Sequence, residues 1–356
     1  MSDVDSFFEE IYQGRKGINW GYTLGLNKLE ELTDGLTKST YVLLFASSGT
    51  GKSSLALYSY VYKPLMEHLE DDKFKIIFFA LEMKKNFIYA KLMSIYLHER
   101  YHLDLGMKEL FSRKKNYTLS EENLKYVEEA RSWLTKVLKV LVVYDENQTA
   151  DSMENIIQQE LEKDGTFDDQ GNYTPNNPDK LVETIVDHAG LLRTGKGRTK
   201  KEEIDRASHM LISFRNRTNL SIVFIMQSNR SVANIDRRKL GFNEPAIEDC
   251  KETGGPSEDA EIVLTVYNPA KDKLAEYRSY DIKQMGDSFR SIICLKSRYG
   301  DANKADCCYF NGKLNIWEEM PPPDKIYDYS IYHPLIIDKS NKKADKEEKK
   351  NLKFTI

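Results

Sequence analysis

The sequence predicts an α/β fold with a mostly parallel, twisted sheet that is flanked by helices and has an antiparallel extension at its C-terminal end. Apolar strand patterns alternate with helical patterns from Thr40 to about Arg230. This alternation is typical of parallel strands joined by crossover helices. After Glu258 the apolar strands follow one another without helices between them, and Asn311-Gly312 is a strong hairpin signal.

Length and composition favour one main domain with tails. The chain has 356 residues, and single cores stop growing near roughly 250 to 300 residues. Its 52 Lys and Arg against 56 Asp and Glu give a net charge of -4, so a polyanion would need a local basic patch. The sequence has no run of about 18 apolar residues and no charged-then-apolar leader, so we expect a cytoplasmic protein without a membrane span.

The cysteines show no CxxC spacing and lie in or beside apolar strand patterns. We therefore expect reduced, structural thiols and no zinc site. The adjacent Cys307 and Cys308 would point to opposite faces of a strand, so a disulfide between them would be strained. The four cysteines are Cys250, Cys294, Cys307 and Cys308.

The N-terminal segment predicts a short amphipathic helix, because its apolar residues recur at helical spacing. They are Val4, Phe7, Phe8, Ile11 and Tyr12. This helix could fold back on its own core or dock on a neighbouring subunit. We divide the chain into a linker helix with its linker (1–20), a main domain (21–320) and a partly disordered tail (321–356).

The sequence of the main domain predicts strands that alternate with helices and, later, strands that follow one another. Strands are expected over 41–46, 74–82, 136–145, 181–192 and 220–230, and later over 260–268, 288–298 and 304–319. Helices are expected over 52–69, 84–99, 152–165 and 201–218. The polar insertion over 167–180 contains two prolines and predicts an exposed loop, and the mixed-charge tail over 338–351 predicts disorder.

The segment "SSGTGKSS" lies between a strand and a helix, with Gly51, Lys52 and Ser53 in the order that a phosphate-binding loop needs. Backbone amides and the helix N-terminus would cradle phosphates, Lys52 would face the β and γ phosphates, and Ser53 would offer a hydroxyl to magnesium. Ala46 replaces the first glycine of the motif, where a small residue suffices. We predict an ATP and Mg²⁺ site whose cradle comprises Ser47, Ser48, Gly49, Thr50, Gly51, Lys52, Ser53 and Ser54.

Three polar residues end strand patterns, at the edge where open α/β sheets place their ligands. Glu82 could deprotonate water for attack on the γ phosphate, or it could be a helix N-cap. Asp187 ends "ETIVD" and would support magnesium, and Gln227 ends "SIVFIMQ" and could contact the γ phosphate. We expect His188 to be packed or hydrogen-bonded rather than catalytic.

Together these stretches resemble the RecA-like motor domain of DnaB-type replicative DNA helicases. "GLTKSTYVLLFASSGTGKSS", "FFALEM", "TIVDHAGLL", "IVFIMQSNR", "EDCKETGGPSEDAEIVLTVYN" and "CLKSRYG" match motifs of that family in the right order. The resemblance covers about Gly21 to Trp317 and implies a RecA-like P-loop NTPase core. It makes Glu82 the catalytic base, Gln227 a sensor, and Lys296 and Arg298 residues that act on a neighbouring subunit's nucleotide.

The sequence departs from the family in several places. We expect the chain to lack the large N-terminal domain that cellular members use for primase and collar formation, which puts primase binding in question. The compact size resembles a bacteriophage-encoded member. His188-Ala189 replaces the usual aromatic and leucine, and Pro256-Ser257 alters the acidic motif.

Two basic segments, over 193–201 and 229–239, leave the edge of the sheet where the resemblance places DNA in the centre of a ring. Either could instead be a solvated loop, but copies around a ring would form a basic channel inside an acidic particle. A third segment after Cys250 matches the family's loop that grips the strand's backbone. The predicted DNA-binding residues are Arg193, Lys196, Arg198, Lys200, Arg230, Arg237, Arg238, Lys251, Glu252 and Gly254.

The resemblance implies an ATP-dependent helicase, a homo-oligomer expected to be a hexamer, that translocates on single-stranded DNA and unwinds duplex by strand exclusion. The helix near the N-terminus resembles the linker helix that family members pack on the adjacent subunit. A helicase loader and other replisome proteins are candidate partners. Two alternatives are a recombinase-like or clock-type ATPase, disfavoured because Met83 rather than a second glutamate follows Glu82, and a nucleotide-gated DNA-binding loader.

Overall fold

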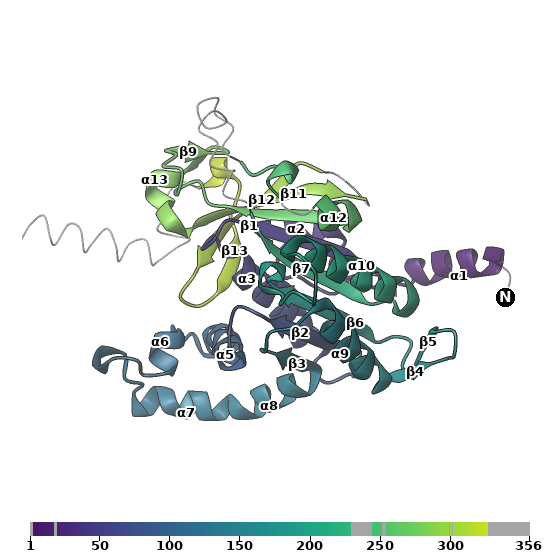
Figure 1. Ribbon diagram of the computed structural model, residues 1–356. Helices are drawn as coiled ribbons and strands as arrows, with labels where there is room; N and C mark the ends of the chain where they lie inside the picture. Colours follow the sequence, from purple (N-terminus) through teal and green to yellow (C-terminus); the bar gives the residue numbers. More distant parts are fainter. Residues whose placement is uncertain are drawn as a thin grey trace, which may run out of the picture.

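The computed structural model describes residues 3–17, 20–228, 244–250, 254–298, 300 and 302–326. Within these residues, one sheet of nine strands has the order β13-β12-β11-β8-β1-β7-β6-β2-β3 (Figure 1). Helices cover both of its faces, so the predicted α/β fold is confirmed.

Six adjacent strands of the sheet run parallel to one another. Every residue of the first two strands from the N-terminus is buried, as expected for strands covered on both sides. The six strands are β1 (Tyr41–Ala46), β2 (Phe74–Ala80), β3 (Leu141–Tyr144), β6 (Leu181–Asp187), β7 (Ser221–Gln227) and β8 (Ile262–Tyr267).

The predicted antiparallel extension is confirmed, but it begins one strand later than expected. The strand β8 pairs in parallel with β1 and only its other neighbour, β11, is antiparallel to it. The extension consists of β11 (Phe289–Ser297), β12 (Lys304–Asn311) and β13 (Ile316–Glu319), and Asn311-Gly312 opens the hairpin between the last two. The segment before β11 also holds a small hairpin, β9 (Glu276–Tyr277) and β10 (Tyr280–Asp281), and the short helix α13 (Ile282–Met285).

The helices form two layers around the sheet (Figure 1). One hydrophobic cluster contains residues such as Leu44 and Leu92, and the other contains Phe45 and Phe214, so alternate residues of β1 serve the two layers. The first layer includes a continuous helix made of α3 (Lys52–Leu55), a π-helical stretch (Ala56–Tyr62) and α4 (Lys63–His68), followed along the chain by α5 (Lys85–Tyr101), α6 (Met107–Leu110), α7 (Glu121–Glu129) and α8 (Arg131–Val140). The second layer includes α9 (Ala150–Glu162) and α10 (Lys200–Thr218).

The domain also contains the helices α2 (Asn27–Thr33) and α12 (Gly254–Asp259). Among the helices of the described residues, none is long and apolar enough to cross a membrane. All four cysteines are free and buried. Burial raises the pKa of the Cys250 thiol to about 12, which keeps it protonated and unreactive.

Two predicted elements differ from the structure. The strand expected over 136–145 begins only at Leu141, because the preceding residues belong to α8, where Trp133 and Val137 are buried four residues apart. A short apolar run of this kind fits a strand or a helix equally well. The insertion over 167–180 is not a plain loop, since β4 (Gly165–Phe167) and β5 (Tyr173–Pro175) pair in an antiparallel hairpin.

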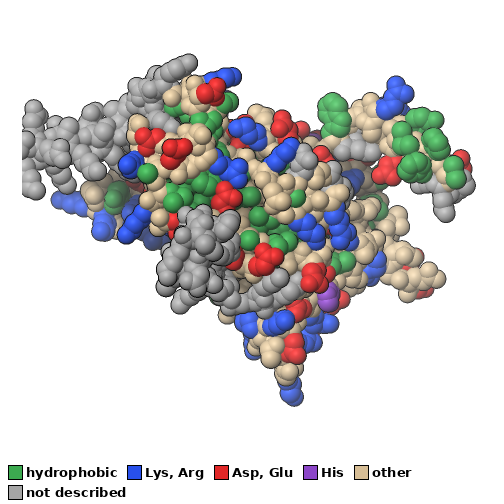
Figure 2. Space-filling view, turned by 90° about the horizontal axis from the view of Figure 1, so that it is seen from above, with side chains coloured by type: hydrophobic (Ala, Val, Ile, Leu, Met, Phe, Trp, Pro, Cys, Tyr) green, Lys and Arg blue, Asp and Glu red, His purple; other side chains and the backbone are tan. Residues whose placement is uncertain are grey.

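The N-terminal helix α1 (Asp3–Arg15) extends away from the sheet (Figure 1). Its apolar residues are exposed, including Phe7 at 60% and Ile11 at 43%, and Figure 2 shows hydrophobic side chains along this projecting helix. The alternative in which the helix folds back on its own core is therefore wrong.

Asp306 offers a test of how burial acts on stability. It is fully buried on β12, and burial, with a smaller contribution from Glu319, raises the pKa of its carboxyl to about 7. The folded state therefore favours the protonated form, and this stabilisation is complete below the unfolded pKa near 4 and lost as the pH rises through about 7. We expect Asp306→Asn to melt a few degrees above the wild type at pH 8.5 and the difference to shrink toward pH 5.

Differential scanning fluorimetry across this pH range measures the effect. The exposed Asp169→Asn serves as the matched control and should follow the wild type at every pH. An Asp306→Asn melting temperature that stays parallel to the wild type from pH 5 to pH 8.5 would contradict the expected burial effect.

Candidate active site

The strand order brings the predicted site residues to one edge of the sheet. The strands β1, β7, β6 and β2 are neighbours, and the register pairs Ala46 with Gln227 and Ala80 with Asp187. Because these strands are parallel, their carboxyl ends meet at one edge of the sheet. The phosphate loop, Gln227, Asp187 and Glu82 all lie at this edge. This is the edge at which open α/β sheets bind ligands.

The phosphate loop connects β1 to α3 in a conformation that depends on glycine. Gly49 and Gly51 have φ of 70° and 111°, in the region that other residues rarely adopt. A Cβ on Gly51 would also lie 3.0 Å from Cζ2 of Trp317. Ala46 is fully buried at the end of β1, where its small side chain fits the turn into the loop.

Ser53 and Asp187 together form a donor set that fits Mg²⁺. The Ser53 hydroxyl donates to Oδ1 of Asp187 at 3.0 Å, and Oδ2 of Asp187 has no hydrogen-bond partner among the described residues. Burial raises the pKa of Asp187 to about 6, although the Ser53 hydroxyl and Lys52 act in the opposite direction. A buried carboxylate oxygen without a partner beside a hydroxyl is what a hard cation with oxygen ligands would satisfy.

Glu82 lies two residues beyond the end of β2 and faces Lys52. Its Oε2 lies 4.0 Å from Nζ of Lys52, and its side chain is 46% exposed. The carbonyl of Asp187 accepts the N–H groups of Leu81 and Glu82 at 2.7 and 3.2 Å, which joins the two acidic residues through the backbone.

The N-cap alternative for Glu82 is wrong. The N-cap residue of α5 is Lys84, and the carboxylate that accepts the N–H of Lys85, at 3.0 Å, belongs to Asp145. The Glu82 side chain is therefore available at the mouth of the site.

Gln227 and His188 complete this edge. Gln227 is exposed at the end of β7, and the next N–H, of Ser228, donates to the carbonyl of Ala46 at 3.0 Å. His188 is buried, as expected, and burial lowers the pKa of its imidazole. The peptide bond between Asp187 and His188 is cis.

The sequence analysis missed Lys91, a cation of α5 that lies near the site. Lys91 on α5 donates to Oδ1 of Asn315 at 2.9 Å, and the same oxygen accepts the hydroxyl of Ser54 at 2.7 Å. Burial lowers the pKa of Lys91, while the charges of Asp187 and Glu82 raise it. In the sequence Lys91 looks like any polar residue of an amphipathic helix, so only the fold shows that it faces the acidic pair.

Lys296 and Arg298 lie at the opposite edge of the sheet from the phosphate loop of their own chain. Lys296 donates to the carbonyls of Ser257 and Glu258 at 3.0 and 2.9 Å. Arg298 is 54% exposed and pairs with Oε1 of Glu261 at 3.2 Å.

The position of Glu261 shows how far these cations are from the loop. Its Oε2 accepts the N–H of Tyr41, the first residue of β1, whereas the loop follows the last residue of that strand. The length of β1 therefore separates them by roughly 15 to 20 Å. Arg298 cannot reach the phosphates of its own subunit.

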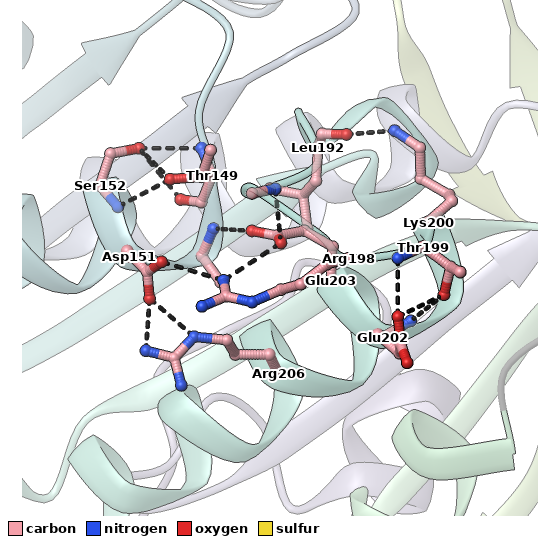
Figure 3. Close-up of polar contacts among 12 residues, drawn as sticks. Thr149, Asp151, Ser152, Leu192, Arg198, Thr199, Lys200, Glu202, Glu203 and Arg206 are labelled. Carbon is pink, nitrogen blue, oxygen red and sulfur yellow. Dashed lines mark hydrogen bonds and ion pairs between the residues drawn. The ribbon is translucent and has the colours of Figure 1, made fainter.

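Two cations of the basic segment after β6, Arg198 and Lys200, are held by contacts within the fold (Figure 3). Arg198 pairs with Asp151 at 2.9 Å and with buried Glu203 at 3.3 Å, and Lys200, the first residue of α10, donates to the carbonyl of Leu192. Glu203 also accepts the N–H groups of Ala150 and Gly195, at 2.6 and 2.9 Å. The network anchors the segment to α9 and α10.

Arg193 and Lys196 are exposed in the same segment, and within the described part of the chain neither forms an ion pair. Gly254 begins α12, whereas Arg230, Arg237, Arg238, Lys251 and Glu252 lie outside the described residues.

A mostly parallel sheet with this strand order, a phosphate loop after the central strand β1, and acidic residues at the end of β6 and just beyond β2 define a P-loop NTPase domain of RecA-like fold. The family model for the DnaB-like helicase C terminal domain matches residues 21–318. The chain belongs to this family, as the sequence motifs predicted.

Curated relatives agree with this assignment. The replicative DNA helicase DnaB of Mycoplasma pneumoniae is 25% identical over 282 residues, which are 78% of this chain and 52% of the relative. The replicative DNA helicase DnaB of Buchnera aphidicola subsp. Baizongia pistaciae is 24% identical over 304 residues, 84% of this chain and 55% of the relative. The chain spans about half the length of the curated relatives it matches.

Solved structures share the fold. One solved ATPase domain superposes with a TM-score of 0.69 at 17% identity, over 90% of this chain and 100% of that one. A DnaB-like replicative helicase whose structure was described with its interactions with primase gives a TM-score of 0.66 at 17% identity, over 90% of this chain and 68% of that one.

Proposed function

We propose that the chain is the motor of a replicative DNA helicase, which hydrolyses ATP and moves along single-stranded DNA as a homohexamer, excluding the other strand of the duplex. The observation that carries this proposal is that the residues of the site lie at two opposite edges of the sheet. Lys52, Ser53, Asp187 and Glu82 converge at one edge of the sheet, while Arg298 is exposed at the opposite edge. Family membership supports the assignment to helicases rather than to other ATPases.

The residues at the first edge each have a distinct task. Lys52 would neutralise charge on the β and γ phosphates, and the carboxylate of Glu82 would accept a proton from the attacking water. Ser53 and Asp187 would hold Mg²⁺, which when bound neutralises charge on the same phosphates. Gln227 would contact the γ phosphate and link its loss to the segment that follows β7.

Arg298 and Lys296 would act on the nucleotide of the adjacent subunit. An arginine supplied to a transferring phosphoryl group stabilises its negative charge, and supplying it from a neighbour makes hydrolysis depend on assembly. In a ring, each subunit would offer its cradle on one side and Arg298 on the other. This head-to-tail arrangement is a heterologous interface that closes by rotation.

The helix α1 provides the first test of assembly. Its exposed apolar face would be covered by the adjacent subunit, so the double variant Phe7→Ser, Ile11→Ser should dissociate the oligomer without unfolding the main domain. Light scattering with nucleotide present measures the mass. Glu9→Ser with Gln13→Ser on the polar side of the helix is the control, and an oligomer that survives the apolar substitutions would contradict docking through this face.

The free cations after β6 provide the second test. Arg193→Glu with Lys196→Glu should weaken binding of single-stranded DNA by about tenfold or more and reduce its salt dependence by about one unit of slope per lost phosphate contact. Fluorescence anisotropy at several salt concentrations measures both. Lys125→Glu on α7 reverses another exposed charge away from this segment and should bind like the wild type. Equal affinities of the double variant and the wild type for single-stranded DNA would show that this segment does not contact the DNA.

A forked DNA substrate tests the activity itself. Unwinding that requires ATP hydrolysis and a single-stranded arm, assayed with each arm in turn, would also give the direction of movement. A recombinase-like or clock-type ATPase would hydrolyse ATP without unwinding the fork, and a loader would bind DNA with negligible turnover. A loader protein and other replisome proteins are proposed partners on the strength of family membership alone.

A further inference from the structure

Two cations from the C-terminal part of the domain contact the phosphate loop. Nζ of Lys271, in the segment after β8, donates to the carbonyl oxygen of Ser48 at 2.8 Å. Nε of Arg290, on β11, donates to the carbonyl oxygen of Thr50 at 2.6 Å. The two cations therefore hold alternate carbonyl groups of a single loop.

Arg290 is a buried part of the fold. Its side chain is 2% exposed, its guanidinium lies 5.0 Å from the centre of the Phe310 ring, and Nη1 donates to the carbonyls of Asp287 and Phe289 at 2.8 and 2.7 Å. Burial lowers the pKa of Arg290 to about 10, so it remains charged at neutral pH. Its Nη2 faces Oδ1 of Asp287 at 3.6 Å, whereas Nε and Nη1 bond to carbonyl groups and so fix the position of those carbonyls.

The direction of these carbonyls sets the direction of the next N–H groups. In a trans peptide the C=O of one residue and the N–H of the next point in opposite directions. With the carbonyls of Ser48 and Thr50 directed at the two cations, the N–H groups of Gly49 and Gly51 point to the other side of the loop. Successive N–H groups turned to one side form an anion-binding nest.

Lys271 also lies beside Gly49, because a Cβ built on this glycine would lie 3.3 Å from Nζ of the lysine. Within the described residues, the N–H groups of Gly49 and Gly51 donate to no backbone carbonyl. Both are therefore free for a ligand.

We propose that Lys271 and Arg290 are positioning residues that hold the phosphate loop in its binding conformation before nucleotide arrives. They act through the carbonyls of Ser48 and Thr50, and the groups that touch phosphate are the N–H groups of Gly49 and Gly51. This inference rests on the proposed nucleotide site. It assigns to the antiparallel part of the sheet a role at the nucleotide of its own subunit, in addition to the role of Arg298 at the neighbour.

Lys271→Met tests the inference without disturbing the core, because Lys271 is exposed. Losing one hydrogen bond of about 1 kcal/mol should raise the Kd about fivefold for both MgATP and magnesium tripolyphosphate. Turnover at saturating ATP should stay within about twofold, because the loop positions phosphates but transfers no proton. Lys271→Arg should restore the wild-type Kd, and Lys273→Met, at an exposed lysine of the same segment, is the matched control.

Arg290→Lys and Arg290→Met supply the second arm. Lysine can reach one carbonyl, so we expect its Kd for both ligands to lie between the wild type and Arg290→Met. If Arg290→Met does not fold, Arg290→Lys and the Lys271 variants decide. A merely structural arginine would lower the melting temperature and leave the Kd of the folded protein unchanged.

The two ligands separate the possible failures. A wild type that binds neither MgATP nor tripolyphosphate would overturn the proposed nucleotide site, and this inference with it. Wild-type Kd values in Lys271→Met and in the folded Arg290 variants would overturn the inference alone. A rise in Kd for the Lys271 variants alone would contradict the proposal that Lys271 and Arg290 both hold the loop. It would instead indicate that Lys271 contacts the phosphates directly.

Discussion

Glu82→Gln is expected to reduce steady-state ATP turnover by about two to four orders of magnitude, the usual contribution of a general base. The amide keeps the size of the side chain but cannot accept the proton of the attacking water. Because Glu82 is half-exposed and touches Lys52 only at 4.0 Å, the substitution should leave the fold and the phosphate cradle intact. ATP binding should therefore remain within a few fold of the wild type.

Turnover of the wild type and Glu82→Gln is measured with and without single-stranded DNA. The exposed Glu146→Gln is the matched control and should keep wild-type turnover. Equal and negligible turnover in the wild type and Glu82→Gln would favour a nucleotide-gated loader. Equal and substantial turnover would show that another group deprotonates the water.

Arg298→Ala is expected to lower turnover by about a thousandfold, because the charge on the transferring phosphoryl group loses its cation from the neighbour. The fold should survive the change. Glu261, the partner of Arg298, keeps its ion pair with Arg215 and its bond with the N–H of Tyr41.

Single-turnover hydrolysis by the assembled protein measures this loss, and ATP binding and the mass of the oligomer are measured in parallel. Arg217→Ala, at an exposed arginine near the end of α10, controls for the loss of a surface charge and should keep full activity. An Arg298→Ala protein that hydrolyses ATP at the wild-type rate would contradict the proposal that Arg298 stabilises the transferring phosphoryl group of the adjacent subunit.

The central part of the fold could be predicted because its strands are buried on both faces. Most of the parallel strands are short apolar runs with a polar residue at or just after their last position, so both the strand and its carboxyl end are visible in the sequence. This is why the order of elements and the edge that holds Lys52, Asp187 and Gln227 agree with the structure. Glu82 was placed at the right edge, although it lies two residues past its strand.

Other features could not be predicted because they depend on contacts between distant segments. Leu141 begins a strand only because the residues before it complete a helix against the core. Arg198 looks like any other cation of a basic loop, and only the fold shows that it pairs with buried Glu203. Lys91, Lys271 and Arg290 reach the site from parts of the chain that carry no motif.

The proposed motor requires an active site shared by two copies of the chain, and mixing two inactive variants tests this requirement most directly. Arg298→Ala retains Glu82 and the phosphate cradle, and Glu82→Gln retains Arg298. In a mixed ring the site is therefore intact wherever the cradle of an Arg298→Ala subunit faces the arginine of a Glu82→Gln subunit. If subunits exchange at random, an equimolar mixture should recover about a quarter of wild-type turnover. A mixture no more active than the two variants measured separately, although mixed rings have formed, would contradict a shared site.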